Sequence, residues 1–192
     1  MRRKLIWWVL CSAAIAVAFL YHAELVRATP ASPSPGFKAT TIANGSFGEI
    51  DVFNQVSKDM LPDGFDGNVW LSLQKTKGPS DLYVQSNVWQ ALGSTNCLNA
   101  PCSTGWHTHP GHSLIVVTSG TLTEYESDCT PHVYTFVAGQ PAPTLVDPGH
   151  GHVHIIRNEG STPASTIAVQ LIPKGAARRI DALAPDNCQN IQ

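Results

Sequence analysis

The sequence predicts an all-β fold, either a sandwich or a jelly roll, and three observations lead to this prediction. Glycine (15 residues) and proline (14 residues) are frequent and follow no period, as in chains with many turns. Apolar residues make up 43% and charged residues 14% of the 192 residues, which is enough to bury the core of one domain. Short strand-like runs also alternate with turn signals, which favours sheets over long helices.

The predicted elements follow a proline-rich linker at Thr29–Gly36. The expected strands are Val69–Thr76, Asp81–Leu92, Leu114–Thr118, Thr121–Tyr125, His132–Val137, Val153–Ile156 and Ser165–Ile172. Turn signals such as Lys77-Gly78-Pro79 and Ser119-Gly120 separate them. Only Gly175–Leu183 has a weakly helical pattern. Glu124 and Glu126, two residues apart on one expected strand, are interpreted as part of a solvated face.

The first 28 residues have the order of a secretory signal peptide. A positive start at Arg2–Lys4 precedes the run Leu5–Tyr21, which is apolar apart from Ser12, and Val26-Arg27-Ala28 offers small residues for cleavage. We therefore expect a secreted or periplasmic protein whose mature chain begins near Thr29. Two alternatives stay open. One is an uncleaved membrane anchor, since roughly 17 apolar residues is the lower limit for spanning a bilayer, and the other is a core helix.

The charge distribution bears on the partners of this protein. The net charge is −2, but the first 28 residues hold four cations and one anion, so the remaining chain has a net charge of −5. It also lacks a basic stripe, which makes nucleic acid and anionic membrane surfaces poor candidates. We expect a small-molecule ligand, no nucleic acid and no stable membrane contact after signal cleavage. A homodimer stays open as an alternative to a monomer.

Four cysteines remain once Cys11, which lies in the apolar run, is set aside. Three pairings are formally open to them. We expect disulfides, with Cys97 joined to Cys102 across a short loop and Cys129 joined to Cys188, which ties the tail to the barrel. Four reduced thiols or a zinc site are the alternatives, and the zinc site lacks a second closely spaced cysteine pair.

Six of the eight histidines lie in two short segments, 105–112 and 149–154. Residues two apart in a strand point to the same face. His107 and His109 can therefore direct two imidazoles at one point, and so can His152 and His154. Neutral imidazole is the usual nitrogen ligand of zinc, copper, iron and nickel. The pattern predicts a metal site of three or four histidines, and loop histidines that only form hydrogen bonds are the alternative.

Both histidine segments resemble the paired motifs of the cupin superfamily. The first family motif contains His-x-His, a glutamate and a closing glycine, and His107, His109 and Gly120 match it. The second motif, Pro-x-Gly-x-x-His-x-x-x-Asn, is matched by Gly151, His154 and Asn158, with the proline one residue out of place. The resemblance covers about residues 105–171. It implies a double-stranded β-helix, the jelly-roll barrel of the cupins.

The resemblance also implies a metal site. The family's glutamate ligand falls near position 113, where this chain has Ser113, a poor ligand for a divalent cation. The implied site is one divalent ion (Fe, Mn, Zn, Ni or Cu) held by His107, His109 and His154, as in three-histidine dioxygenases of the family. By alternation His152 lies on the same face as His154, and it is either a fourth ligand or a proton carrier.

The expected organisation is a signal peptide at residues 1–28, a linker and N-terminal arm at 29–65, the cupin barrel at 66–175 and a C-terminal tail at 176–192. The expected function is that of an exported cupin that binds one divalent transition metal, with dioxygenase-like activity on a small molecule as the leading enzymatic hypothesis. A non-catalytic module of the cell envelope that binds a small molecule or metal is the alternative. The sequence assigns no catalytic residues.

Overall fold

The computed structural model describes residues 32–61, 63 and 69–192, so the predicted signal peptide lies outside the described residues. Strands dominate, and the only helices in the described part of the chain are two short 3-10 helices, neither of which is long and apolar enough to cross a membrane. In chain order the elements are β1 (Phe37–Phe47), β2 (Asp51–Ser57), η1 (Lys58–Met60), β3 (Val69–Lys75), β4 (Ser80–Trp89), β5 (Cys102–Ser103), β6 (His107–Thr108), β7 (Ser113–Ser119), β8 (Thr121–Tyr125), β9 (Pro131–Thr135), β10 (Thr144–Asp147), β11 (Ile155–Asn158), β12 (Ala164–Pro173), β13 (Ile180–Asp181) and η2 (Asp186–Cys188).

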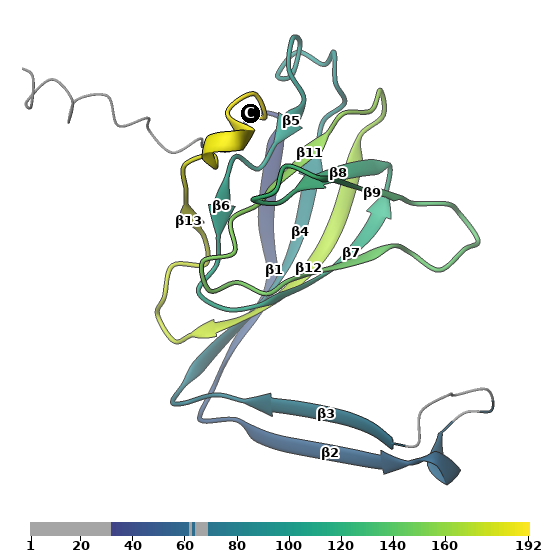
Figure 1. Cartoon of the computed structure of the whole chain (residues 1–192), viewed down its shortest axis with the longest axis vertical. Helices are drawn as coiled ribbons and strands as arrows, with labels where there is room; N and C mark the ends of the chain where they lie inside the picture. Colours follow the sequence, from purple (N-terminus) through teal and green to yellow (C-terminus); the bar gives the residue numbers. More distant parts are fainter. Residues whose placement is uncertain (1–31, 62, 64–68) are drawn as a thin grey trace, which may run out of the picture.

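Two antiparallel sheets form the walls of a barrel (Figure 1). The larger sheet has the strand order β1-β4-β12-β7-β10, and the smaller has the order β5-β11-β8-β9. Side chains alternate across these strands as the two-residue period requires. In β7, Ser113, Ile115 and Val117 are buried, whereas Leu114 and Val116 face outward. One face of each sheet therefore lines the interior, and the predicted all-β jelly roll is confirmed.

Two parts of the chain differ from the sequence patterns. Strand β1 lies in the segment predicted as an N-terminal arm, yet it pairs with β4 along its whole length, from Phe37↔Trp89 to Phe47↔Ser80. The weak helix predicted at Gly175–Leu183 is wrong. Gly175 has a φ of 75°, which a helix does not permit, and β13 then pairs with β6. Tertiary pairing overrides a weak local propensity here.

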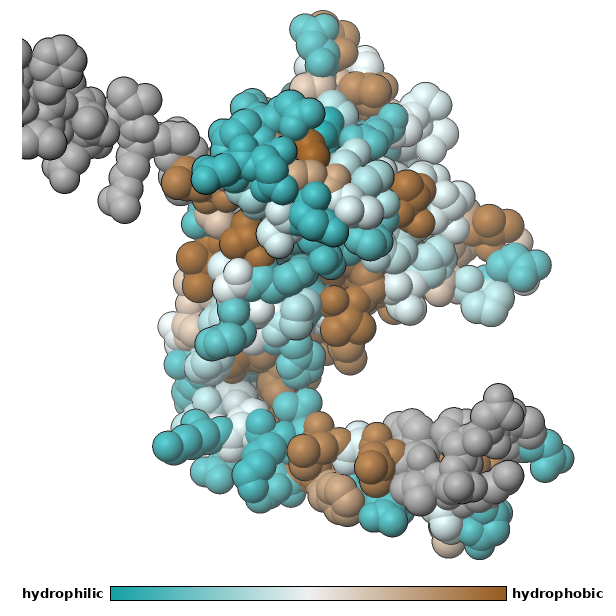
Figure 2. Space-filling view, in the orientation of Figure 1, coloured by the Kyte–Doolittle hydropathy of each residue, from teal (hydrophilic) through white to brown (hydrophobic). Residues whose placement is uncertain are grey.

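The β2–β3 hairpin projects away from the barrel (Figure 1). Its apolar side chains remain exposed on that arm (Figure 2), with Phe53 at 63% and Leu73 at 67% of full exposure. Neither strand belongs to the two sheets of the barrel. The barrel therefore positions the interior residues without help from this hairpin.

The buried apolar residues form two clusters at different places in the barrel. The larger cluster lies between the sheets and includes Trp89, Ile115 and Ile156. The smaller one surrounds Trp106, which immediately precedes β6, and it includes Cys188 from the C-terminal tail. The Trp106 indole N–H also donates a 2.7 Å hydrogen bond to the Ile191 carbonyl. The tail therefore holds the start of β6 in place.

The cysteine pairing predicted from the sequence is confirmed. Cys97 is joined to Cys102 with a Cα–Cα distance of 5.3 Å, and Cys129 is joined to Cys188 with a Cα–Cα distance of 5.6 Å. Disulfides are typical of proteins in oxidising compartments. The bond at Cys188 fastens the tail that covers Trp106.

Candidate metal centre

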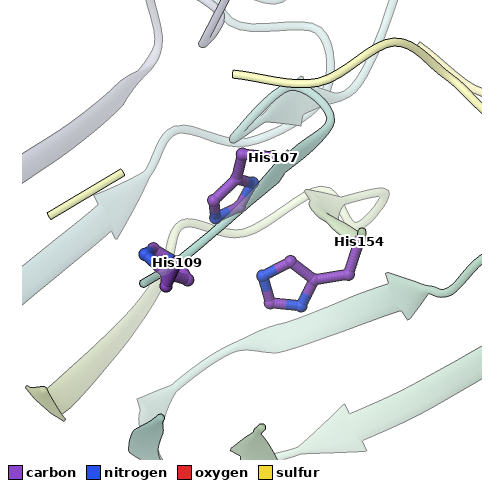
Figure 3. A group of neighbouring side chains, drawn as sticks. All are labelled: His107, His109 and His154. Atoms are coloured by element: carbon purple, nitrogen blue, oxygen red, sulfur yellow. The ribbon is translucent and has the colours of Figure 1, made fainter. Parts of the chain in front are cut away.

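Three of the histidines singled out by the sequence lie together inside the barrel and point toward one another (Figure 3). His107 begins β6, His109 follows it, and His154 immediately precedes β11. The ring centroid of His107 lies 4.8 Å from that of His109 and 4.5 Å from that of His154. One ring nitrogen of each histidine lies within 4.8 Å of the other two. The geometry is that of a group able to hold one metal ion.

Backbone contacts bring the two histidine segments together. His107 and His154 form an antiparallel bridge, in which each backbone N–H donates to the other's carbonyl at 2.9 and 3.0 Å. The His150 N–H donates to the His109 carbonyl at 2.8 Å. The adjacent Gly149 has a φ of 68°, and a Cβ there would collide with the Gly111 carbonyl. Glycine at this position therefore permits the close approach of the two segments.

Each imidazole is held through its Nδ1 atom. The Nδ1 of His107 donates to the Gly105 carbonyl at 2.9 Å, the Nδ1 of His109 donates to the Arg178 carbonyl, and the Nδ1 of His154 donates to Glu124 Oε1 at 2.8 Å. At His107 and His154, where the partner of Nδ1 is an acceptor, these bonds fix the tautomer in which Nε2 carries a free lone pair. The Nε2 of His154 is buried and has no hydrogen-bond partner in the described structure.

Burial favours the neutral imidazoles that bind metals. Burial, followed by the nearby His154 and Arg179, lowers the pKa of His107 well below its usual 6.5. Burial also lowers the pKa of His109, although its bond to the Arg178 carbonyl and the Asp147 carboxylate oppose that shift. Both histidines are therefore neutral at pH 7 and can act as nitrogen ligands.

Glu124 was wrongly interpreted from the sequence as part of a solvated face. It is only 4% exposed, and its Oε2 accepts a 3.2 Å hydrogen bond from the Tyr134 hydroxyl while its Oε1 accepts from His154. Burial and the nearby Glu124 raise the pKa of Tyr134 to about 12, so its hydroxyl stays a donor. A carboxylate behind a histidine is the usual support of a metal ligand. The sequence signal that could have identified Glu124 as buried is the two-residue alternation of strands. Leu122, two positions earlier on β8, is a core residue, and Glu124 therefore points to the same face.

Ser113, which occupies the position of the family's glutamate, is buried and lines the same cavity as the three histidines. Its hydroxyl accepts a 3.1 Å hydrogen bond from the side-chain amide of Gln170. The same amide nitrogen lies 2.8 Å from the Nδ1 of His109. Ser113 is therefore linked to His109 only through the Gln170 amide.

Asp147 was not predicted from the sequence and lies beside the histidines. It is fully buried, and its Oδ1 accepts a 2.8 Å hydrogen bond from the Gly149 N–H. Its Oδ2 lies 3.5 Å from the Nε2 of His109 and 3.9 Å from the Nε2 of His154. His152 lies at the edge of this group, with its Nδ1 3.6 Å from Asp147 Oδ1 and its Nε2 3.5 Å from Glu126. Asp147, His152 and His154 thus form a second, overlapping group of potential ligands.

The three histidines line a cavity of about 90 Å³ between the two sheets. One wall is polar, and the Asn87 side-chain amide donates to the Thr166 hydroxyl across it at 3.1 Å. Apolar side chains such as Trp89, Ile115 and Ile156 form another part of the lining. Arg178 and Arg179 also line the cavity, and none of its lining residues in the described chain is acidic. The remaining lining residues are Phe37, Ala39, Gln85, Thr104, Ser113, Ala168 and Gln170.

Comparisons with known proteins found no matching family model and no matching curated protein. Among solved structures, the chain is similar to a cupin superfamily protein from Desulfitobacterium hafniense, at 12% identity over 71% of this chain and 84% of that one, with a TM-score of 0.37. It is also similar to the polyketide cyclase RemF from Streptomyces resistomycificus, at 11% identity over 83% of this chain and 82% of that one, with a TM-score of 0.44. The DMSP lyase DddQ from Ruegeria pomeroyi is 14% identical over 55% of this chain and 44% of that one, with a TM-score of 0.40.

Similarities at this level carry no inference about activity. The fold rests on the described structure itself. Two antiparallel sheets face each other in the order given above, and the two histidine segments meet between them. The chain therefore has the cupin fold that its histidine motifs predicted.

Proposed function

We propose that this protein binds one divalent transition metal ion through the Nε2 atoms of His107, His109 and His154. The observation that carries the proposal is that each ring is held through Nδ1 while one ring nitrogen of each histidine lies within 4.8 Å of the other two. Three neutral imidazoles suit iron, manganese, zinc, nickel or copper better than calcium or magnesium, which prefer oxygen ligands.

The cavity beside the histidines is proposed to bind a small anion such as a carboxylate. Arg178 and Arg179 line it without an acidic residue among the described lining residues. Arg179 donates through Nε to Asp181 at 2.6 Å, and its Nη2 is buried without a partner in the described structure. A guanidinium with spare donors is suited to a carboxylate. The volume of about 90 Å³ restricts the ligand to a few non-hydrogen atoms inside the barrel.

The leading reaction is a dioxygenase-like oxidation of that small molecule. Apart from the histidines, the described lining residues include no carboxylate, lysine, tyrosine or cysteine that could act as an acid or base. A bound redox-active metal such as iron would supply oxygen activation, and a non-redox metal would polarise a carbonyl group. In this proposal the chain's own residues orient the substrate through Gln85, Asn87 and Thr166, while the apolar wall excludes water.

The same lack of acid–base residues favours a second candidate function, a non-catalytic module of the cell envelope that captures a small anion or a metal ion. Both candidates place the protein outside the cytoplasm. The two disulfides support this location because they fit an oxidising compartment. N-terminal sequencing of the native protein tests the proposed export, which requires a mature chain that begins near Thr29.

One experiment separates the two candidates. The protein is purified without a nickel column, loaded anaerobically with Fe(II), and mixed with a panel of small carboxylates. Oxygen uptake that depends on one carboxylate supports the enzyme, and tight carboxylate binding without oxygen uptake supports the binding module. Absence of metal binding contradicts the enzyme and the proposed metal site.

Glu124→Gln is expected to weaken metal affinity by about 10- to 100-fold, because a neutral amide no longer supports the basicity of His154. The measurement is a competition titration with a chromophoric chelator. Glu126→Gln is the matched control, since Glu126 is 39% exposed and contacts His152 instead. Equal affinity in both variants and in the unaltered protein would show that Glu124 does not support the site.

Ser113→Ala is expected to leave the metal content of the protein within about a fifth of its unaltered value. The Ser113 hydroxyl already accepts a hydrogen bond from Gln170, and a neutral hydroxyl is a poor ligand for a divalent cation. Metal analysis of the folded variant checks this, and a loss of most of the metal would make Ser113 a ligand.

A further inference from the structure

We infer that Asp147 is the carboxylate ligand of this site, so that strand β10 supplies the group that the cupin motif expects from position 113. The inference rests on the proposed metal site and adds a fourth ligand to it. The three observations that carry it are strand register, an unpaired buried oxygen, and two distances.

The register places Asp147 directly opposite Ser113. Strand β10 pairs with β7 in antiparallel fashion, and Asp147↔Ser113 is the last pair of that ladder. Both residues are buried and point into the barrel. Side chains of directly opposed residues in such a pair begin about 4.5–5.5 Å apart. An aspartate at this position therefore delivers a carboxylate to the same region of the interior as a glutamate at position 113.

The second observation is the state of the carboxylate. Asp147 is 0% exposed, and its Oδ2 has no hydrogen-bond partner in the described structure. No lysine or arginine in the described part of the chain forms an ion pair with Asp147. Its near neighbours are the imidazoles of His109, His152 and His154. A buried carboxylate is strongly destabilising unless a cation compensates its charge. A metal ion at the histidines would be that cation.

The third observation is the spacing of the atoms. Asp147 Oδ2 lies 3.5 and 3.9 Å from the Nε2 atoms of His109 and His154. These distances are longer than an ordinary N–H···O hydrogen bond of about 2.7–3.2 Å. Ligand atoms about 2.1 Å from a shared ion lie roughly 3.0–3.4 Å from one another. The oxygen lies from each of the two nitrogens at nearly the distance that separates neighbouring ligands.

This assignment gives His152 a different role from that of a ligand. Its Nδ1 faces Asp147 Oδ1 at 3.6 Å, and its Nε2 faces Glu126 at 3.5 Å. His152 therefore faces the Oδ1 atom of Asp147, whereas the proposed ligand atom is Oδ2. The net charge of the ion with its ligands falls from +2 to +1, which still leaves the centre attractive to an anion in the cavity.

The test compares Asp147→Asn with Glu126→Gln, which removes the other carboxylate beside His152. Asparagine keeps an oxygen to accept the Gly149 N–H. Cobalt(II) serves as the probe, because its visible spectrum reports the ligand set. We expect Asp147→Asn to weaken cobalt affinity at least about 100-fold and to change the spectrum of the residual complex. Glu126→Gln should change the affinity less than threefold and leave the spectrum unaltered.

Cobalt affinity within threefold of the unaltered protein and an unchanged spectrum in Asp147→Asn would overturn the inference while leaving the histidine site intact. Failure of the unaltered protein to bind cobalt would instead overturn the proposed function. If Asp147→Asn does not fold, a crystal structure of the cobalt-bound unaltered protein decides the question. An Asp147 oxygen within about 2.2 Å of the ion supports the inference, and a separation of more than about 3 Å overturns it.

Discussion

Replacing His154 with alanine is expected to reduce the metal content of the purified protein to less than about a tenth of an ion per chain. The variant loses one of three imidazole ligands, and each of them is expected to contribute a full metal bond. It also leaves Glu124 buried without its 2.8 Å partner, at a cost of about 1–3 kcal/mol in stability. Metal analysis measures the first effect, and circular dichroism confirms that the variant folds.

His132→Ala is the control for this experiment, because His132 is exposed on β9 and lies outside the described groups of potential ligands. Its metal content should equal that of the unaltered protein. His107→Ala is expected to behave like His154→Ala, since its ring lies 4.5 Å from that of His154. Full metal retention in folded His107→Ala and His154→Ala variants would place the metal elsewhere.

Removal of the Cys129–Cys188 disulfide is expected to lower the free energy of unfolding by about 4 kcal/mol. The bond closes a loop with a sequence separation of 59 residues, so the chain-entropy model assigns it a large effect on the unfolded state. Removal of the Cys97–Cys102 bond, with a separation of 5 residues, should lower it by only about 2 kcal/mol. Urea unfolding of the two double-alanine variants under non-reducing conditions measures both values.

The tail disulfide is also expected to affect the metal site. Cys188 packs beside Trp106, which precedes His107, and the Trp106 indole donates to Ile191 in the tail. A variant without Cys129 and Cys188 should therefore bind metal more weakly than the variant without Cys97 and Cys102. Equal destabilisation of the two variants would contradict the chain-entropy account of the two bonds. Equal metal affinity would show that the tail does not hold β6 in place.

The sequence was sufficient to predict the three histidines that converge. His107 and His109 are two residues apart in the chain, and the family motif supplied His154, so neither inference needed the register of the sheet. Asp147 could not be found in this way. Its place opposite Ser113 depends on the pairing of β10 with β7, and no local pattern of the short β10 segment specifies that pairing.

Glu124 illustrates the same limit. Two glutamates two residues apart are typical of a solvated strand face, but β8 pairs with β11, and Glu124 lies opposite Ile156 in the barrel. Burial of a carboxylate is unexpected until its partner His154 is known.

Strand β1 was not predicted from the sequence, because its residues lack the pattern of a strand. It is an exposed edge strand of mostly polar and small residues, so it lacks the apolar alternation that marks a half-buried strand.

Anomalous X-ray scattering from crystals of the protein grown with its native metal is the most direct measurement of the central claim. We expect one anomalous peak per chain inside the barrel, about 2.0–2.2 Å from the Nε2 atoms of His107, His109 and His154. A peak bound to other residues, or no peak after incubation with iron, manganese, zinc, nickel or copper, would contradict the proposal that these three histidines form a metal centre.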